Sequence, residues 1–180
     1  MKLTTFALLL LFIAFRNSFT LLQGKRSRKK MTAFIYWGRK IIEIVISFAI
    51  PILLLTEVIK TDIQPFPYYL GILLSIAGLL LMAWTRFYRN KDWGFMGDDA
   101  GETLFTKGPY GLTRHPYYVG AFLAGVGIYL QLNWAFTLLI IPVGFFMLYA
   151  AGKEDAFLMG KFDKKYAAYK KKVGVTPWLY

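Results

Sequence analysis

The feature that most constrains this chain is a long stretch without charge. No Asp, Glu, Lys or Arg occurs from 117 to 152, a run of 36 residues. A single helix of that length would extend about 54 Å at 1.5 Å per residue. Because a bilayer's hydrocarbon core is only about 30 Å thick, one crossing cannot use the whole run. We therefore predict a hairpin of two helices over 117–150, folded back at Gln131 to Trp134.

Three further apolar stretches precede the hairpin, at 3–22, 41–59 and 68–88. About 20 apolar residues suffice to cross a bilayer core, and 57% of the chain is hydrophobic. The sequence thus predicts an all-α, polytopic membrane protein with about five transmembrane helices. The first stretch also fits a cleaved signal peptide, which would leave four helices.

Basic residues are concentrated on one side of these predicted helices. Residues 23–40 contain seven Lys and Arg, residues 85–114 contain five and residues 153–172 contain seven, whereas the opposite connections contain only Lys2 and Lys60. Basic connections remain in the cytoplasm. We therefore expect an external N-terminus and a cytoplasmic active site, in a bacterial inner membrane or the endoplasmic reticulum.

Composition excludes several classes of function. The chain has no Cys and a single His, which excludes disulfides and thiolate chemistry, and we expect no metal site. A net charge of +12 would indicate nucleic-acid binding in a soluble protein. Here membrane topology accounts for the charge, and we expect no nucleic-acid partner. No glycine fingerprint follows a strand and opens a helix, which argues against a Rossmann domain.

After residue 152 the pattern becomes that of an amphipathic helix. Apolar and aromatic residues recur at spacings of four, four, three and four at Leu158, Phe162, Tyr166, Tyr169 and Val173. This spacing lays them on one stripe of a helix, with lysines on the remaining surface. We predict a C-terminal helix at the membrane surface, with lysines that attract anionic headgroups.

Polar residues gather at both ends of the predicted hairpin. Because a hairpin brings its ends together, Arg114 and His115 should face Glu154 and Asp155 across about 8 to 10 Å. Pro116 suits the first helical position, and the N-terminus of that helix offers free N–H groups and a partial positive charge to a carboxylate. The acidic pair could accept hydrogen bonds from an ammonium or from ribose hydroxyls, so this pocket suits a cofactor derived from an amino acid.

Each of these residues also has a structural interpretation. Taken alone, His115 fits helix capping, and the acidic pair fits the end of a transmembrane span. Gly125 and Gly127 suggest a glycine-rich loop, but they lie in mid-span, where small residues let helices approach closely. We therefore interpret these two glycines as packing residues.

Three motifs together resemble a known superfamily. They are Glu-Thr-Leu-Phe-Thr-Lys-Gly-Pro-Tyr at 102–110, Arg-His-Pro-Tyr-Tyr-Val-Gly at 114–120, and Glu154-Asp155 leading into the Leu/Phe/Tyr helix. The pattern is similar to the isoprenylcysteine carboxyl methyltransferase and phospholipid methyltransferase superfamily over about the last 80 residues. The length of 180 residues allows a single domain, with the three predicted transmembrane helices in 1–88, and the resemblance implies a cofactor-binding region in 89–180.

The resemblance also implies a cofactor and the residues that bind it. The cofactor is S-adenosylmethionine, and the implied binding residues are Glu102, Thr103, Leu104, Phe105, Tyr110, His115, Tyr118, Glu154 and Asp155. Two positions depart from the family pattern, since Asp155 replaces a second glutamate and Asp163 replaces a glycine. Prenylcysteine enzymes also have an arginine at the position of Ala150, which argues against a prenylcysteine acceptor.

The expected reaction is direct displacement of an activated methyl group onto a lipid or prenylated amphiphile. Arg114 and Glu154 are the predicted catalytic residues. Arg114 would meet an anionic acceptor, whereas Glu154, Asp155 or His115 would take the proton of an amine. Two alternatives are an NADPH-dependent reductase of the sterol reductase type and a non-catalytic membrane scaffold.

Overall fold

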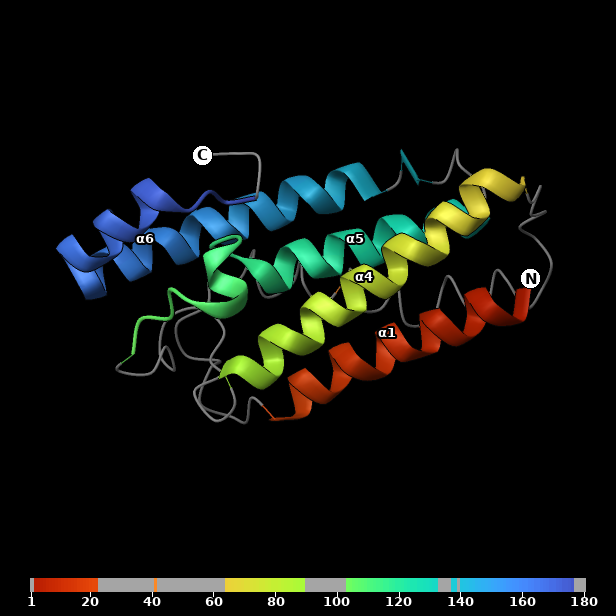
Figure 1. The fold of residues 1–180 in the computed structure, drawn as a ribbon, viewed down its shortest axis with the longest axis horizontal. Coiled ribbons are helices and arrows are strands. Elements are labelled where there is room, and N and C mark those ends of the chain that lie inside the picture. Colours follow the sequence, from red (N-terminus) through yellow and green to blue (C-terminus); the bar gives the residue numbers. More distant parts are fainter. Residues whose placement is uncertain are drawn as a thin grey trace.

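The computed structural model describes residues 2–22, 41, 64–89, 103–132, 137–138 and 140–176. Its elements are α1 (Lys2–Leu22), α4 (Pro65–Arg89), the 3₁₀ helix η4 (Gly108–Gly111), α5 (Pro116–Leu132) and α6 (Ile140–Lys172) (Figure 1). No strand occurs within this part of the chain, in agreement with the predicted all-α class. The predicted span 41–59 lies outside the described residues except for Ile41, and Glu102 lies outside them as well.

Helix α4 has the dimensions and the surface of a membrane-crossing helix. Among the described residues it is the one helix long and apolar enough to cross a bilayer, and Leu3–Ala14 and α5 are shorter apolar helices. Phe66, Leu73, Leu80 and Phe87 recur every seven residues on α4 and are 65–78% exposed. This stripe is about 32 Å long, close to the thickness of a hydrocarbon core. One of the five predicted spans is thus supported by length and composition.

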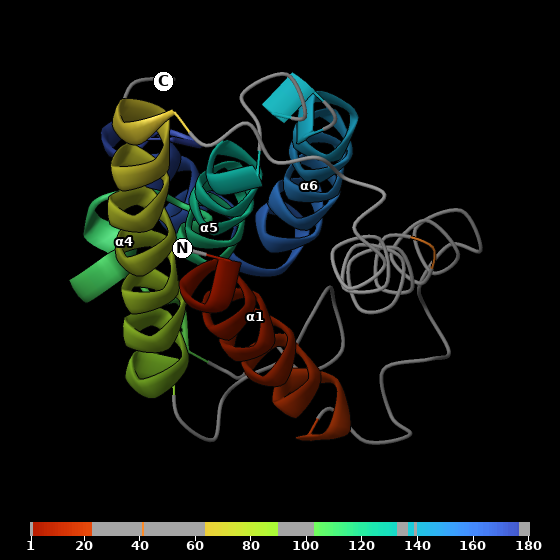
Figure 2. The same ribbon diagram turned by 90° about the vertical axis from the view of Figure 1, so that its right-hand side faces the viewer.

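Helices α4 and α5 are in backbone contact through glycines. A Cβ added at Gly71 would lie 2.6 Å from the carbonyl oxygen of Gly127, and one at Gly120 would lie 2.8 Å from that of Gly78. Figure 2 shows the two helices side by side. The interpretation of Gly127 as a packing residue is therefore confirmed, and Gly125 leaves room for the Ile140 side chain of α6.

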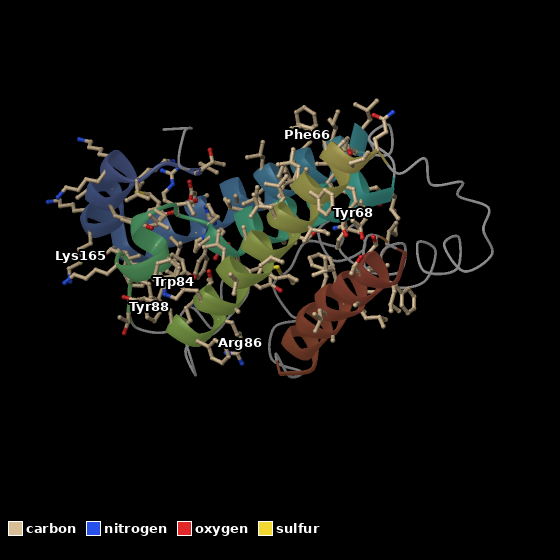
Figure 3. All side chains as sticks on the ribbon, turned by 45° about the vertical axis from the view of Figure 1, so that its right-hand side comes forward. Phe66, Tyr68, Trp84, Arg86, Tyr88 and Lys165 are labelled. Atoms are coloured by element: carbon tan, nitrogen blue, oxygen red, sulfur yellow. The ribbon has the colours of Figure 1, made fainter. Side chains whose placement is uncertain are left out.

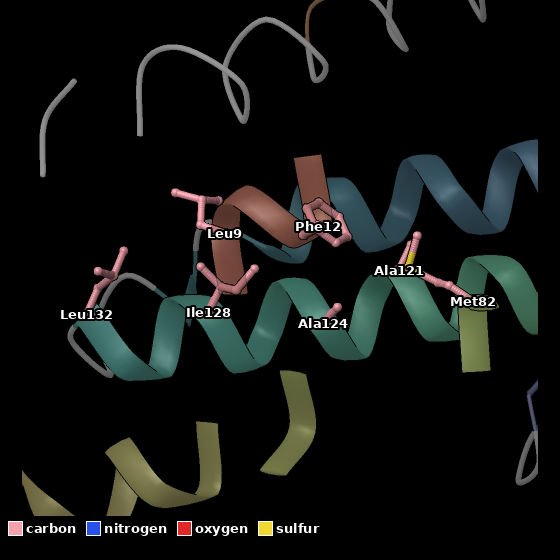
Figure 4. Packing of buried hydrophobic residues seen from close by; sticks show 7 residues of the cluster. All are labelled: Leu9, Phe12, Met82, Ala121, Ala124, Ile128 and Leu132. Atoms are coloured by element: carbon pink, nitrogen blue, oxygen red, sulfur yellow. The ribbon is translucent and has the colours of Figure 1, made fainter. Parts of the chain in front are cut away.

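The apolar core joins three helices. Leu9 and Phe12 of α1 and Met82 of α4 pack against the buried α5 residues Ala121, Ala124, Ile128 and Leu132 (Figure 4). Beside this core, Gln131 donates to the Ser75 hydroxyl at 3.0 Å and accepts from Thr5 at 3.2 Å. Polar groups buried among apolar helices require such partners, and their hydrogen bonds fix the register of the three helices.

Helices α5 and α6 run antiparallel, as the predicted hairpin requires (Figure 1). The prediction of a single, uninterrupted amphipathic helix at the C-terminus is wrong, because Asp163 has φ 43° and ψ −117° and interrupts α6. A straight helix would separate residues 155 and 166 by about 16 Å. Instead, the Tyr166 hydroxyl donates a hydrogen bond to Asp155. The chain therefore reverses at Asp163, and we call residues 164–172 the returning arm.

Candidate functional site

A cluster of charged side chains lies where α5 begins and the first part of α6 ends. His115 Nε2 lies 2.8 Å from Asp155 Oδ1, and His115 Nδ1 lies 3.5 Å from Glu154 Oε2. Arg114 Nη2 lies 3.4 Å from Asp155 Oδ2. The predicted proximity of the hairpin's two ends is thus confirmed, and we call Arg114, His115, Glu154 and Asp155 the charged cluster.

The two carboxylates keep the buried His115 protonated. Burial alone would lower the pKa of His115, but hydrogen bonds to Asp155 and Glu154 and the charges of both carboxylates raise it to about 9. Burial is the largest single effect and raises the pKa of each carboxyl, yet the hydrogen bond and charge of His115 and the other nearby donors together outweigh it, lowering the pKa of Glu154 and bringing that of Asp155 to about 2. At neutral pH an imidazolium therefore lies between two carboxylates and donates through both nitrogens.

Asp155 is surrounded by protein donors. Besides its contacts with His115 and Arg114, Asp155 accepts a hydrogen bond from the Tyr166 hydroxyl, and Lys170 Nζ lies 3.7 Å from its Oδ2. Tyr166 and Lys170 both belong to the returning arm, so the carboxylate joins this arm to α5. The geometry favours a positioning role for Asp155 and leaves Glu154 as the carboxylate with fewer protein partners.

Arg114 is likewise held by the C-terminal part of the chain. Its Nη1 donates to the Lys170 carbonyl at 3.3 Å, and its backbone N–H donates to the Gly174 carbonyl at 2.9 Å. The neighbouring Thr113 hydroxyl donates to the Val175 carbonyl and accepts from the His115 N–H at 3.2 Å. Arg114 Nε is buried and has no hydrogen-bond partner among the described residues.

An aromatic group lies beside the charged cluster. The rings of Phe105 and Tyr110 are 6.0 Å apart, and Tyr88 at the end of α4 contacts both. Gly108 has φ +62°, and a Cβ there would lie 2.6 Å from the Tyr88 ring, so this turn requires glycine. Burial is the main cause that raises the pKa of Tyr110 to about 12. The family motif at 102–110 thus contributes two neighbouring rings to the site, tilted by 30° relative to each other.

Arg89 belongs to this aromatic group and was not predicted from the sequence. Its guanidinium lies 5.6 Å from the centre of the Phe105 ring, and Nη1 donates to the Tyr110 hydroxyl at 3.5 Å. Its charge also helps to lower the pKa of Glu154. From the sequence alone, Arg89 is only a basic residue at the end of a predicted span, and nothing indicates a role in the site. Figure 3 shows its neighbours Arg86 and Tyr88 at one end of α4 and Phe66 at the other.

The remaining predicted site residues differ in position. Tyr118 stacks on His115 with ring centres 5.6 Å apart, and its interaction with Glu154 helps to lower the pKa of that carboxyl. Thr103 is exposed and Leu104 is half-buried, in the extended segment that precedes η4. The structure therefore brings Tyr118 to the charged cluster, whereas Thr103 faces solvent.

An apolar cavity of about 240 Å³ lies between α5 and α6. Phe122 and Met147 line its apolar walls, and His115 and Tyr118 line its polar end. From His115 to Leu123 the cavity follows α5 for about 12 Å, close to the depth of one leaflet's hydrocarbon. Its shape suits a molecule with an apolar chain and a polar head.

Comparison with known proteins agrees with this geometry. The model of the phospholipid methyltransferase family matches residues 66–165, more than half of the 180-residue chain. The comparison with curated proteins and the comparison with solved structures each gave no match. The matched segment contains α4 from Phe66 onwards, η4, α5 and the charged cluster. The chain belongs to the phospholipid methyltransferase family of integral membrane proteins.

Proposed function

We propose that this protein transfers a methyl group from S-adenosylmethionine to the amine head of a membrane lipid, at the cytoplasmic face of a multi-pass membrane domain. The observation that carries the proposal is the contact between an apolar cavity and an ionised cluster, which meet at His115. The cavity suits the lipid chain, and the cluster suits a charged, water-soluble donor. The family match supports methyl transfer in general.

The side chains present fit the parts of S-adenosylmethionine. The ionised Glu154 suits its ammonium or ribose hydroxyls. The buried Nε of Arg114, which has no hydrogen-bond partner among the described residues, is a donor for its carboxylate. Phe105 and Tyr110 offer ring faces to the adenine. When bound, the cofactor supplies a methyl group already activated by a sulfonium centre.

The protein's own contribution is to bind, orient and exclude water. Direct displacement requires the nucleophile to be aligned behind the methyl group, and orientation alone can contribute several kcal/mol, about 7 to 11 in favourable systems. His115 is already protonated, so it serves as a hydrogen-bond donor and does not accept the acceptor's proton. We assign to Glu154 the hydrogen bond that orients the acceptor amine. The proton that the amine loses then passes through Glu154 to water.

A lipid amine is favoured over a prenylcysteine carboxylate as the acceptor. An anionic acceptor would require a further cation at the cavity, but Nη1 and Nη2 of Arg114 are directed towards the Lys170 carbonyl and Asp155, and we assign its Nε to the donor. The position at which prenylcysteine enzymes have an arginine is Ala150, which is buried and uncharged. An amine acceptor needs no such cation.

Titration of detergent-purified protein with S-adenosylhomocysteine tests the donor site. We expect micromolar binding that weakens by about tenfold or more in Glu154→Gln, because a charge-assisted hydrogen bond contributes about 1.5 to 3 kcal/mol. The control is Asp163→Asn, which changes an exposed carboxylate outside the cluster and should bind as wild type does. Wild-type protein that is monodisperse but binds only NADPH would refute the proposal in favour of a reductase.

A further inference from the structure

The C-terminal tail, residues 173–176, lies against the polar end of the cavity. Two hydrogen bonds hold its backbone, from the Arg114 N–H to the Gly174 carbonyl at 2.9 Å and from the Thr113 hydroxyl to the Val175 carbonyl. Val173 N–H also donates to the Tyr169 carbonyl at 3.1 Å, which continues the returning arm into the tail. The tail is therefore tied at its backbone to the residues that immediately precede α5.

This attachment makes the tail part of the cavity wall. Val175 and Thr176 line the cavity together with His115 and Tyr118, so the tail closes the end at which the charged cluster lies. The hydrogen bond that holds Val175 uses its backbone carbonyl, so a substitution of its side chain leaves that bond in place. The family match ends at residue 165, which places this part of the wall outside the matched segment.

We propose that Val175 limits the size of the acceptor head that reaches His115. This inference rests on the proposed function, because it assumes that the cavity holds the acceptor lipid with its head towards the charged cluster. In a cavity of about 240 Å³, one side chain at the polar end determines whether an extra methyl group fits. A larger residue at 175 excludes bulkier heads first, and a smaller one admits them.

The experiment compares two lipids that differ only in head size, phosphatidylethanolamine and its N,N-dimethyl derivative with the same acyl chains. Delipidated wild type, Val175→Trp and Val175→Ala are each mixed with equal amounts of both lipids, and bound lipid is counted by native mass spectrometry. The matched control is Val173→Trp, in the same tail but not in the cavity wall. S-adenosylhomocysteine titration of every variant reports the donor site.

We expect Val175→Trp to lower the ratio of bound dimethyl lipid to unmethylated lipid by at least fivefold, and Val175→Ala to raise it, while Val173→Trp leaves it unchanged. All four proteins should bind S-adenosylhomocysteine equally. An unchanged ratio in both Val175 variants, the same change in Val173→Trp, or failure of wild type to retain either lipid would overturn the inference. Loss of S-adenosylhomocysteine binding by wild type would instead refute the proposed function, whatever the lipid ratio.

Discussion

Replacing Asp163 with glycine should stabilise the protein. Asp163 is exposed and adopts φ 43° and ψ −117° where α6 reverses, a conformation that only glycine adopts without strain. Such a residue stores about 1 to 3 kcal/mol. Glycine removes this strain but loses about 0.5 to 1 kcal/mol through its greater freedom in the unfolded chain. The net expectation is a gain of about 1 kcal/mol in the free energy of unfolding.

Thermal unfolding in detergent measures this gain. For a chain of this size, about 1 kcal/mol corresponds to a rise in Tm of about 2 to 4 °C. The matched control is Lys164→Gly, because Lys164 is also exposed but lies in the returning arm. Glycine within a helix costs about 1 kcal/mol, so this variant should have a lower Tm. If both variants move Tm in the same direction, the backbone strain at Asp163 is not the cause and the reasoning is refuted.

Two further predictions concern the charged cluster and the helix contact. Raising the pKa of His115 from 6.5 to about 9 corresponds to about 3 kcal/mol of stability, present in full below pH 6.5 and lost as pH rises through 9. Denaturation followed from pH 6.5 to 9.5 should show this loss in wild type and a much flatter profile in His115→Gln; parallel profiles would contradict it. A Cβ at Gly78 would lie 2.9 Å from Ala124 Cα, so Gly78→Ala should cost about 1 to 3 kcal/mol. Gly152 has no neighbour within 4 Å of such a Cβ, so Gly152→Ala should be neutral or stabilising, and equal melting temperatures for the two variants would refute the close contact.

The parts of the structure that the sequence predicts are those set by polarity and topology. An uncharged run nearly twice the length of one crossing requires a hairpin, and a hairpin must bring His115 to Asp155. The glycines of α5 were recognisable because small residues in mid-span serve few purposes other than close packing. In each case a strong physical constraint acts over many residues, so a single sequence is enough to predict the feature.

The parts that the sequence does not predict depend on direction or on backbone bonds. The residue spacing from Leu158 to Tyr169 predicts one helical stripe whether or not the chain reverses at Asp163. Periodicity depends only on the number of residues between apolar positions, and it contains no information on the direction of the helix axis. The positive φ at Asp163 carried a faint signal, since the resemblance places a glycine there. The attachment of the tail to Thr113 and Arg114 uses backbone carbonyls, which any residue supplies. For the same reason the different environments of Glu154 and Asp155 emerge only in three dimensions.

The attachment of Arg114 to residues 170–174 also has a consequence for the order of assembly. Chains emerge from the ribosome N-terminus first, so α4 and α5 can pack through their glycines well before the returning arm is synthesised. Until Lys170 and Gly174 arrive, Arg114 lacks both of its backbone acceptors and Asp155 lacks the Lys170 ammonium. The helices therefore assemble early, whereas the charged cluster is completed last. A ribosome-bound chain stalled after residue 165 would hold the whole family-matched segment without a finished site.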